Sequence, residues 1–65
     1  MADREIATMR IADDASGGEA VLILRTTEGK IGLALSLGDA DIEIFLSPAD
    51  AKKLGKHFEK AAQTA

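Results

Sequence analysis

The hydrophobic positions of the chain follow two periods, one before Leu46 and another after Pro48. Up to Leu46, apolar and polar residues mostly alternate, which is typical of a strand with one buried face. After Pro48, apolar residues recur three and four positions apart, which is typical of a helix with one apolar stripe. The pattern therefore predicts several strands followed by one C-terminal helix.

Four segments have the length and composition of strands. The third is the clearest, because leucine or isoleucine alternates with small or polar residues from Ile31 to Leu37. The second is apolar on both faces from Ala20 to Leu24, which predicts a strand covered on both sides. Residues 13–19 are rich in Asp, Ser and Gly, and predict a loop. The strands are expected at residues 4–12, 20–26, 30–37 and 41–46.

The outer two strands of this series have recognisable faces. In the first strand, where the alternation is imperfect, Ala7 and Ile11 are expected to lie on the face opposite Ile6. In the last strand the apolar residues share one face, which is expected to be the core face: Ile42, Ile44 and Leu46.

Short turns suggest how these strands pair. Glu28 and Gly29 are typical of a two-residue hairpin loop, and a loop at these residues places Leu24 opposite Leu33. Directly opposed residues share a face of the sheet, so the leucines of the second strand join the core side of the third. A second short turn, at residues 38–41, follows the third strand and predicts another hairpin.

The second hairpin is expected to have Asp39 and Ala40 at its tip. That register pairs Leu37 with Ile42 and Ala34 with Phe45. Both hairpins place the leucine and isoleucine rows on one common face. This agreement indicates an antiparallel meander of four strands.

The helix has clear signals at its start. Ser47 is expected to cap it, Pro48 suits its first position, and Asp50 adds a carboxylate near the positive end of the helix dipole. The helix is expected to continue to about Gln63, with an apolar stripe that docks on the leucine rows through Leu54 and Phe58. The prediction is an α+β fold, a four-stranded antiparallel meander with one C-terminal helix on one face (β-β-β-β-α), in a single domain, residues 1–65.

One helix covers only one face of such a sheet. The other face is predicted to carry four apolar residues, Val21, Ile23, Ala34 and Phe45, three of which form a row across the strands. A contiguous apolar patch on a protein surface usually marks an interface. Three explanations stay open: the first strand or the 13–19 loop covers the patch, a homodimer forms through it, or another protein binds there.

The charge distribution adds a second candidate surface. The net charge is −3, but residues 1–50 hold ten Asp and Glu against four Lys and Arg, whereas residues 51–65 hold four Lys against one Glu. Strong negative charge in the strand region favours a basic partner. The acidic residues expected beside the apolar patch are Asp39, Asp41 and Glu43, so the predicted partner is a protein with a basic surface.

Lysines of the helix suggest an alternative, binding of nucleic acid. They are Lys52, Lys53, Lys56 and Lys60. Against this, the whole chain is acidic, and no aromatic residues lie between the lysines for base stacking. Their place towards the helix C-terminus also has a structural explanation, since the helix dipole favours cations there. Direct nucleic-acid binding is therefore the less favoured reading.

Residues for catalysis are scarce. The chain has no Cys or Tyr, and it has one histidine, His57. This histidine is ten residues away from Ser47, which caps the start of the helix, so the two are not expected to form a nucleophile-base pair. Cysteine-histidine zinc sites are excluded, and the acidic run from Asp39 to Glu43 lacks the glycine and distal glutamate of a calcium loop. We expect no catalytic site, no metal site and no cofactor.

The remaining composition bears on location. The N-terminal residues lack the apolar core of a signal peptide, and no apolar run approaches the ~20 residues needed to span a bilayer. Absence of cysteine fits a reducing compartment. These features predict a cytoplasmic protein without membrane contact.

In its small size, acidity and lack of catalytic residues, the chain resembles small phage-type inhibitors such as anti-CRISPR proteins, and antitoxin and immunity proteins. That resemblance implies a non-enzymatic inhibitor or regulator that occupies the basic groove of a nucleic-acid-handling protein, by nucleic-acid mimicry. The alternative is a homodimeric structural or nucleic-acid-binding module that uses the lysine-rich helix.

Overall fold

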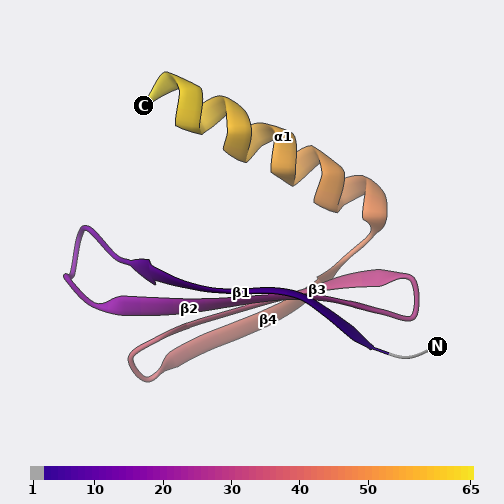
Figure 1. The fold of residues 1–65 in the computed structure, drawn as a ribbon, viewed down its shortest axis with the longest axis horizontal. Coiled ribbons are helices and arrows are strands. Elements are labelled where there is room, and N and C mark those ends of the chain that lie inside the picture. The colour runs from indigo at the N-terminus through magenta and orange to yellow at the C-terminus, as the bar shows by residue number, and fades with distance from the viewer. Residues whose placement is uncertain (1–2) are drawn as a thin grey trace.

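The computed structural model describes residues 3–65 and has four strands followed by one helix (Figure 1). The strands form one antiparallel sheet in the order β1-β2-β3-β4. The elements are β1 (Arg4–Ala12), β2 (Glu19–Thr27), β3 (Lys30–Leu37), β4 (Ala40–Leu46) and α1 (Pro48–Thr64). The predicted α+β meander is confirmed. Residues 1 and 2, which belong to the predicted domain and to the N-terminal segment considered for a signal peptide, lie outside the described residues.

The β2–β3 hairpin has the predicted register. Leu24 lies opposite Leu33, and the turn consists of Glu28 and Gly29 with φ angles of 50° and 77°. Positive φ at both central residues defines a turn whose twist matches the twist of the strands. The Glu-Gly pair was therefore a sufficient signal for this hairpin.

The predicted register of the β3–β4 hairpin is wrong by two residues. The turn consists of Gly38 and Asp39, so Leu37 lies opposite Ala40. Gly38 has a φ of 59°, a conformation that glycine adopts without steric cost and that the first central position of a two-residue hairpin turn requires. Because the shift is even, each side chain of β4 keeps its predicted face, but its neighbours on β3 change.

Strand β1 contains a β-bulge. The pairing with β2 shifts between Glu5 and Ala7, which leaves Ile6 as the extra residue. A bulge redirects the side chains next to it. Ile6 lines the space between sheet and helix together with Leu22 and Leu24, on the same face as Ala7 and Ile11. The prediction that Ile6 lies on the face opposite Ala7 and Ile11 is therefore wrong.

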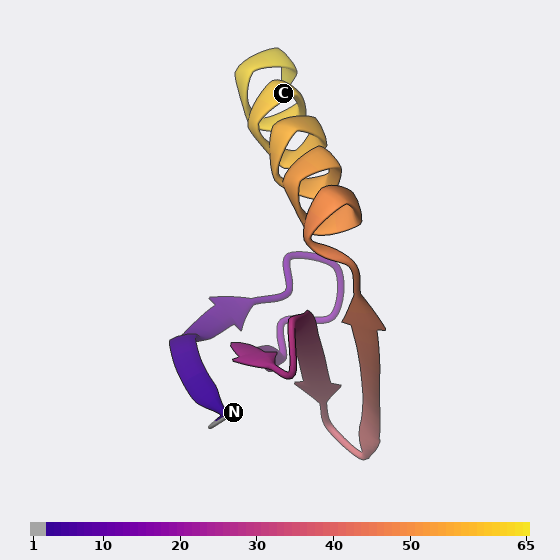
Figure 2. The same ribbon diagram turned by 90° about the vertical axis from the view of Figure 1, so that its right-hand side faces the viewer.

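The helix begins as expected. The Ser47 hydroxyl oxygen accepts a hydrogen bond from the Asp50 amide at 3.1 Å, and Pro48 occupies the first turn. Only Ser47 separates β4 from α1, so the helix leaves directly from the end of the strand. It approaches only β3 and β4, and its axis diverges from the sheet towards the C-terminus (Figures 1 and 2).

This divergence leaves the two layers open towards each other. Leu54 and Phe58 face the sheet as predicted, but no residue of α1 is buried, and Phe58 is 66% exposed. Among residues 3–65, Ala20 and Gly32 are the ones classed as buried. The expected docking of the helix stripe on the leucine rows is therefore incomplete, and a groove occupies the place of a closed core.

Candidate protein-binding surfaces

The sheet face that points away from α1, called the outer face here, carries most of the predicted partner-binding residues. Since Leu22, Leu24 and Leu33 line the space under the helix, the residues that alternate with them lie on the outer face. The structure brings six of the seven predicted residues together there: Val21, Ile23, Ala34, Asp41, Glu43 and Phe45. The seventh, Asp39, lies in the β3–β4 turn.

The predicted row of Ile23, Ala34 and Phe45 is wrong, because the β3–β4 register differs. Ala34 lies opposite Glu43, and Phe45 lies opposite Gly32. An ion pair of 2.6 Å joins Nη2 of Arg25 on β2 to Oε2 of Glu43 on β4, and so crosses β3. The apolar residues of the outer face are therefore divided by a charged pair.

Phe45 is fixed in place although it is 52% exposed. Gly32 is buried, and a Cβ atom added to it would lie 3.3 Å from Cε1 of Phe45 and 3.2 Å from Cγ of Arg25. The glycine thus allows the aromatic ring and the arginine stem to approach the backbone of β3 from either side. Phe45 therefore presents an apolar surface at the edge strand β4 while one side of its ring packs on β3.

Two carboxylates at the end of β4 remote from Phe45 are free of ion pairs. Asp39 and Asp41 are exposed, and the ion pairs found within residues 3–65 are Arg10–Glu19 and Arg25–Glu43. Glu43 is already matched to a cation, with its side chain 40% exposed. For a basic partner, Asp39 and Asp41 are consequently the stronger attractors, and Glu43 would have to exchange its partner.

Two segments of the chain itself are candidates to cover the outer face, the first strand and the 13–19 loop, and in the described residues neither does so. Strand β1 pairs beside β2, at the edge of the sheet. In the loop after β1, Gly18 lies close to Cδ1 of Leu37, which belongs to the helix-side face. Neither segment lies over the outer face.

The loop after β1 is held by its own hydrogen bonds. The Asp13 carboxylate accepts bonds from the Ser16 hydroxyl at 2.7 Å and from the Ala15 amide at 3.2 Å. These bonds favour the charged form and lower the pKa of Asp13 below its ordinary value of 3.8, the Ser16 hydroxyl having the largest effect. The backbone of Asp13 also accepts from Gly17 and donates to Gly18, so the loop is closed at both ends.

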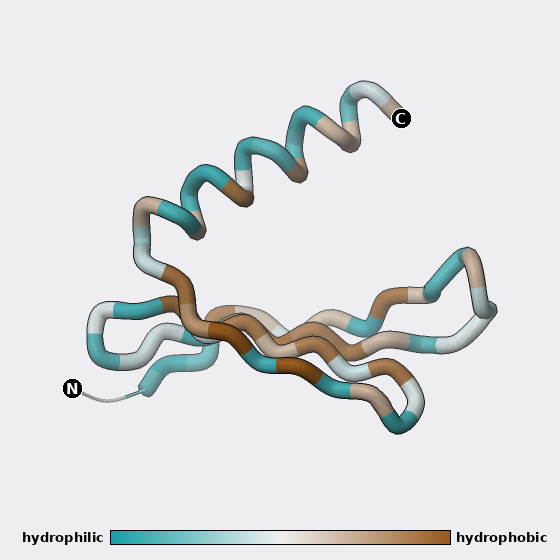
Figure 3. The backbone as a smooth tube through the Cα atoms, turned by 180° about the vertical axis from the view of Figure 1, so that it is seen from behind, coloured by the Kyte–Doolittle hydropathy of each residue, from teal (hydrophilic) through white to brown (hydrophobic). Residues whose placement is uncertain are grey.

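The lysines of the alternative nucleic-acid site lie on α1 and are exposed: Lys52, Lys53, Lys56 and Lys60. At 100° per residue, they occupy the side of the helix opposite Leu54 and Phe58, which face the groove. His57 is also exposed. The helix thus presents a basic surface to solvent and an apolar stripe to the sheet, as the brown and teal segments in Figure 3 indicate.

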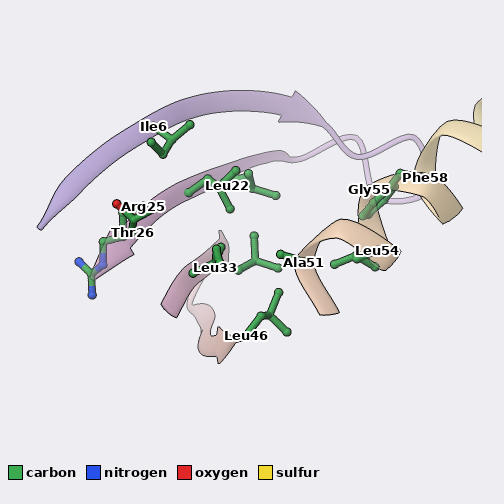
Figure 4. Close-up of a pocket in the computed structure, with 12 residues that line it drawn as sticks. Ile6, Leu22, Arg25, Thr26, Leu33, Leu46, Ala51, Leu54, Gly55 and Phe58 are labelled. Atoms are coloured by element: carbon green, nitrogen blue, oxygen red, sulfur yellow. The ribbon is translucent and has the colours of Figure 1, made fainter. Parts of the chain in front are cut away.

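The groove between sheet and helix is the feature that the sequence patterns did not reveal. It has a volume of about 450 Å³, and its walls come from β1, β2, β3 and β4 on one side and from α1 on the other (Figure 4). Its lining is almost entirely apolar, including Leu22 and Leu33 of the sheet and Leu54 and Phe58 of the helix. The one available signal was the single residue between β4 and α1, which leaves no loop to fold the helix flat.

Comparisons with known proteins give no relative: no family model, curated protein or solved structure matches the chain. Within residues 3–65, no helix is long and apolar enough to cross a membrane. In the same residues, no three or more His, Asp or Glu side chains gather where they could hold a metal ion.

Proposed function

We propose that the chain is a cytoplasmic, non-enzymatic binding protein that attaches through its outer face to a basic surface of a nucleic-acid-handling protein and inhibits or regulates it. The observation that supports this proposal is that exposed carboxylates and a half-exposed aromatic ring share one edge of the sheet: Asp39 in the β3–β4 turn, and Asp41 and Phe45 near opposite ends of the outer face of β4. An aromatic anchor with charged groups towards the rim is a common composition of protein interfaces.

The two kinds of group have different parts in this binding. Carboxylates at the turn attract a basic groove over a distance and raise the association rate, as phosphates of nucleic acid do. The ring of Phe45 then loses its contact with water and slows dissociation. In this scheme the protein imitates the charge of nucleic acid but owes its residence time to an apolar contact.

Affinity capture from the native cell, and from the host or invader that it meets, tests the proposal. The unaltered protein and two variants, Phe45→Glu and Phe58→Glu, serve as baits, because each variant changes one exposed phenylalanine on a different surface. We expect a basic nucleic-acid-handling protein to be retained by the unaltered chain and by Phe58→Glu, and lost with Phe45→Glu.

Binding kinetics measured on the purified complex then separate the contribution of the carboxylates from that of the apolar contact. The double variant with Asp39→Asn and Asp41→Asn should associate more slowly than the unaltered chain, and its association rate should depend less on salt. Binding that is unchanged when Asp39, Asp41 and Glu43 are all neutralised would refute the mimicry.

A second candidate function, a nucleic-acid-binding module, is favoured by the exposed lysine side of α1. Gel-shift binding that disappears when Lys52, Lys56 and Lys60 are replaced by Gln would support it. The expected result under the first proposal is no shift at physiological salt, since the chain carries a net charge of −3.

A further inference from the structure

We infer that the groove between sheet and helix is the interface of a homodimer, in which the α1 helix of each copy packs on the helix-side face of its partner's sheet. This interface lies on the side of the sheet opposite the outer face, so it is independent of the function proposed above. The helix-side face consists of the side chains that alternate with those of the outer face and include Leu22, Leu33 and Leu35.

The exposed area of the single chain points to a missing partner. Its accessible surface is 5379 Å², whereas a compact monomer of 6.8 kDa exposes ~4,000 Å². The radius of gyration is 13.0 Å, against ~10.7 Å for a compact chain of this length. If each copy loses the excess of ~1,400 Å², the dimer interface covers ~2,800 Å², within the range of permanent homodimers.

The excess area is concentrated on one side of the molecule. Most of the large hydrophobic residues that are exposed belong to the helix-side face or to the stripe of α1. They are Ile6, Met9, Ile11, Leu35, Leu37, Ile42, Ile44 and Phe58, with Phe45 the exception on the outer face. Monomeric proteins rarely expose continuous apolar surface of this extent.

A second copy suits this surface because the chain supplies both halves of the contact. At the sheet end remote from the start of α1, Leu37 and Ile42 line a depression to which no residue of α1 contributes. The stripe of α1, in turn, faces the sheet across the open groove and is not covered near Phe58, which is 66% exposed. An exchange between two copies related by a two-fold axis covers both surfaces with one type of contact, and it closes without forming a chain of molecules.

Charge supports the same occupant. Acidic residues edge the open end of the helix-side face, where Asp13 and Asp14 line a depression of about 350 Å³ together with Ile11 and Leu37. The helix segment from residue 51 onward has a balance of three positive charges, from four Lys and one Glu. The lysines lie on the side of α1 opposite its apolar stripe and stay outside the groove when the stripe enters it, so the opposite charges favour the approach of two copies at long range.

Sedimentation equilibrium between about 1 and 100 µM tests the inference, with matched phenylalanine variants. We expect the unaltered chain to have twice its mass of 6.8 kDa. Phe58→Glu should raise the dissociation constant of the dimer at least ~30-fold, as for a central interface residue, whereas Phe45→Glu should leave it nearly unchanged. Circular dichroism checks that both variants keep their strands and helix.

A monomer over the whole concentration range overturns the inference, whether the helix closes on its own sheet or the groove awaits another protein. A dimer that Phe45→Glu dissociates and Phe58→Glu does not also overturns it, because the contact would then lie on the outer face.

Cross-linking identifies the face directly, because the native chain has no cysteine. One tagged chain carries Ala61→Cys on the α1 stripe, and a second chain carries either Ala40→Cys on the helix-side face or Ser36→Cys on the outer face. Ala40 and Ser36 are both exposed, and they lie at the same end of the sheet. A disulfide yield at least ~10-fold higher with Ala40→Cys supports the exchange of helices; equal yields, or a higher yield with Ser36→Cys, refute it.

Discussion

At the scale of single residues, Gly32 decides how the outer face is built. Its missing side chain leaves the space that the stem of Arg25 and the ring of Phe45 occupy. Because Arg25 also pairs with Glu43, one glycine controls the position of an aromatic ring and of an ion pair. The alternation of the third strand is enough to place Gly32 on the face opposite the leucines, but its contact with Phe45 depends on the β3–β4 register, which the sequence analysis predicts wrongly.

Replacing Gly32 by valine should lower the free energy of unfolding by roughly 1–3 kcal/mol, because the added methyl groups displace Arg25 and Phe45. Urea unfolding measures the change. Ser36→Val, on the same strand and face but exposed, is the matched control and should change the stability by less than about 0.5 kcal/mol. Equal stability of Gly32→Val and the unaltered chain would contradict the close contacts around Gly32.

Asp13 gives a prediction for pH. Its pKa is lowered in the folded chain, so its hydrogen bonds stabilise the fold above pH 3.8, and this contribution disappears as the pH falls through the lowered pKa. Ser16→Ala removes the main cause and should bring the pKa of Asp13 back towards 3.8. The unaltered chain should then be more stable than Ser16→Ala at pH 6, with a gap that shrinks at pH 2.5.

Carboxyl NMR titration and urea unfolding at both pH values measure these two effects. Ser36→Ala, on the outer face of β3, removes none of the hydrogen bonds of the loop and should show neither effect. An Asp13 carboxyl group that titrates at or above 3.8 in the unaltered protein would be inconsistent with the loop hydrogen bonds.

At the scale of elements, the turns show what local sequence can and cannot determine. Glu28 and Gly29 predict the β2–β3 turn because they follow a strongly apolar strand and precede an alternating one, with glycine at the second turn position. The β3–β4 turn has three small or acidic residues in succession from Gly38 to Ala40, so two tips are compatible with the alternation. The positive φ of Gly38 selects one of them, the turn with glycine at its first central position.

Gly38→Ala should therefore lower the free energy of unfolding by about 1 kcal/mol or more, because alanine is strained at a φ of 59°. Gly38→Asn is the control, since asparagine tolerates this conformation better. Chemical denaturation of both variants measures the difference. If the two substitutions have the same effect, the turn does not depend on the conformation of residue 38.

The helix shows a different limit of sequence-based prediction. Its cap, first residue and apolar stripe were all readable from local spacing, and α1 ends one residue after the expected Gln63. Its angle to the sheet was not readable, because that angle depends on the direction in which β4 ends and on the single connecting residue Ser47. The faces of the elements could thus be predicted, but the distance between the layers could not.

At the scale of the whole molecule, the open groove links stability to concentration. In a dimer whose helices are exchanged, unfolding includes dissociation, so the midpoint of thermal unfolding rises with protein concentration. We expect an increase of about 5 °C for each tenfold increase in concentration. Calorimetry over a hundredfold range measures it, and Phe58→Glu should lose most of the dependence. A midpoint independent of concentration would indicate that the chain folds alone.

The strand order has a further consequence, for how this protein avoids fibrils. A meander leaves β1 and β4 as sheet edges, whose free backbone groups can pair with another chain. On β1 the bulge at Ile6 interrupts the regular ladder, and on β4 the exposed carboxylate of Asp41, which has no ion pair within residues 3–65, repels a second copy of the same strand. Growth from edge to edge is thereby disfavoured at both ends, and the apolar surface can associate face to face without seeding an endless sheet.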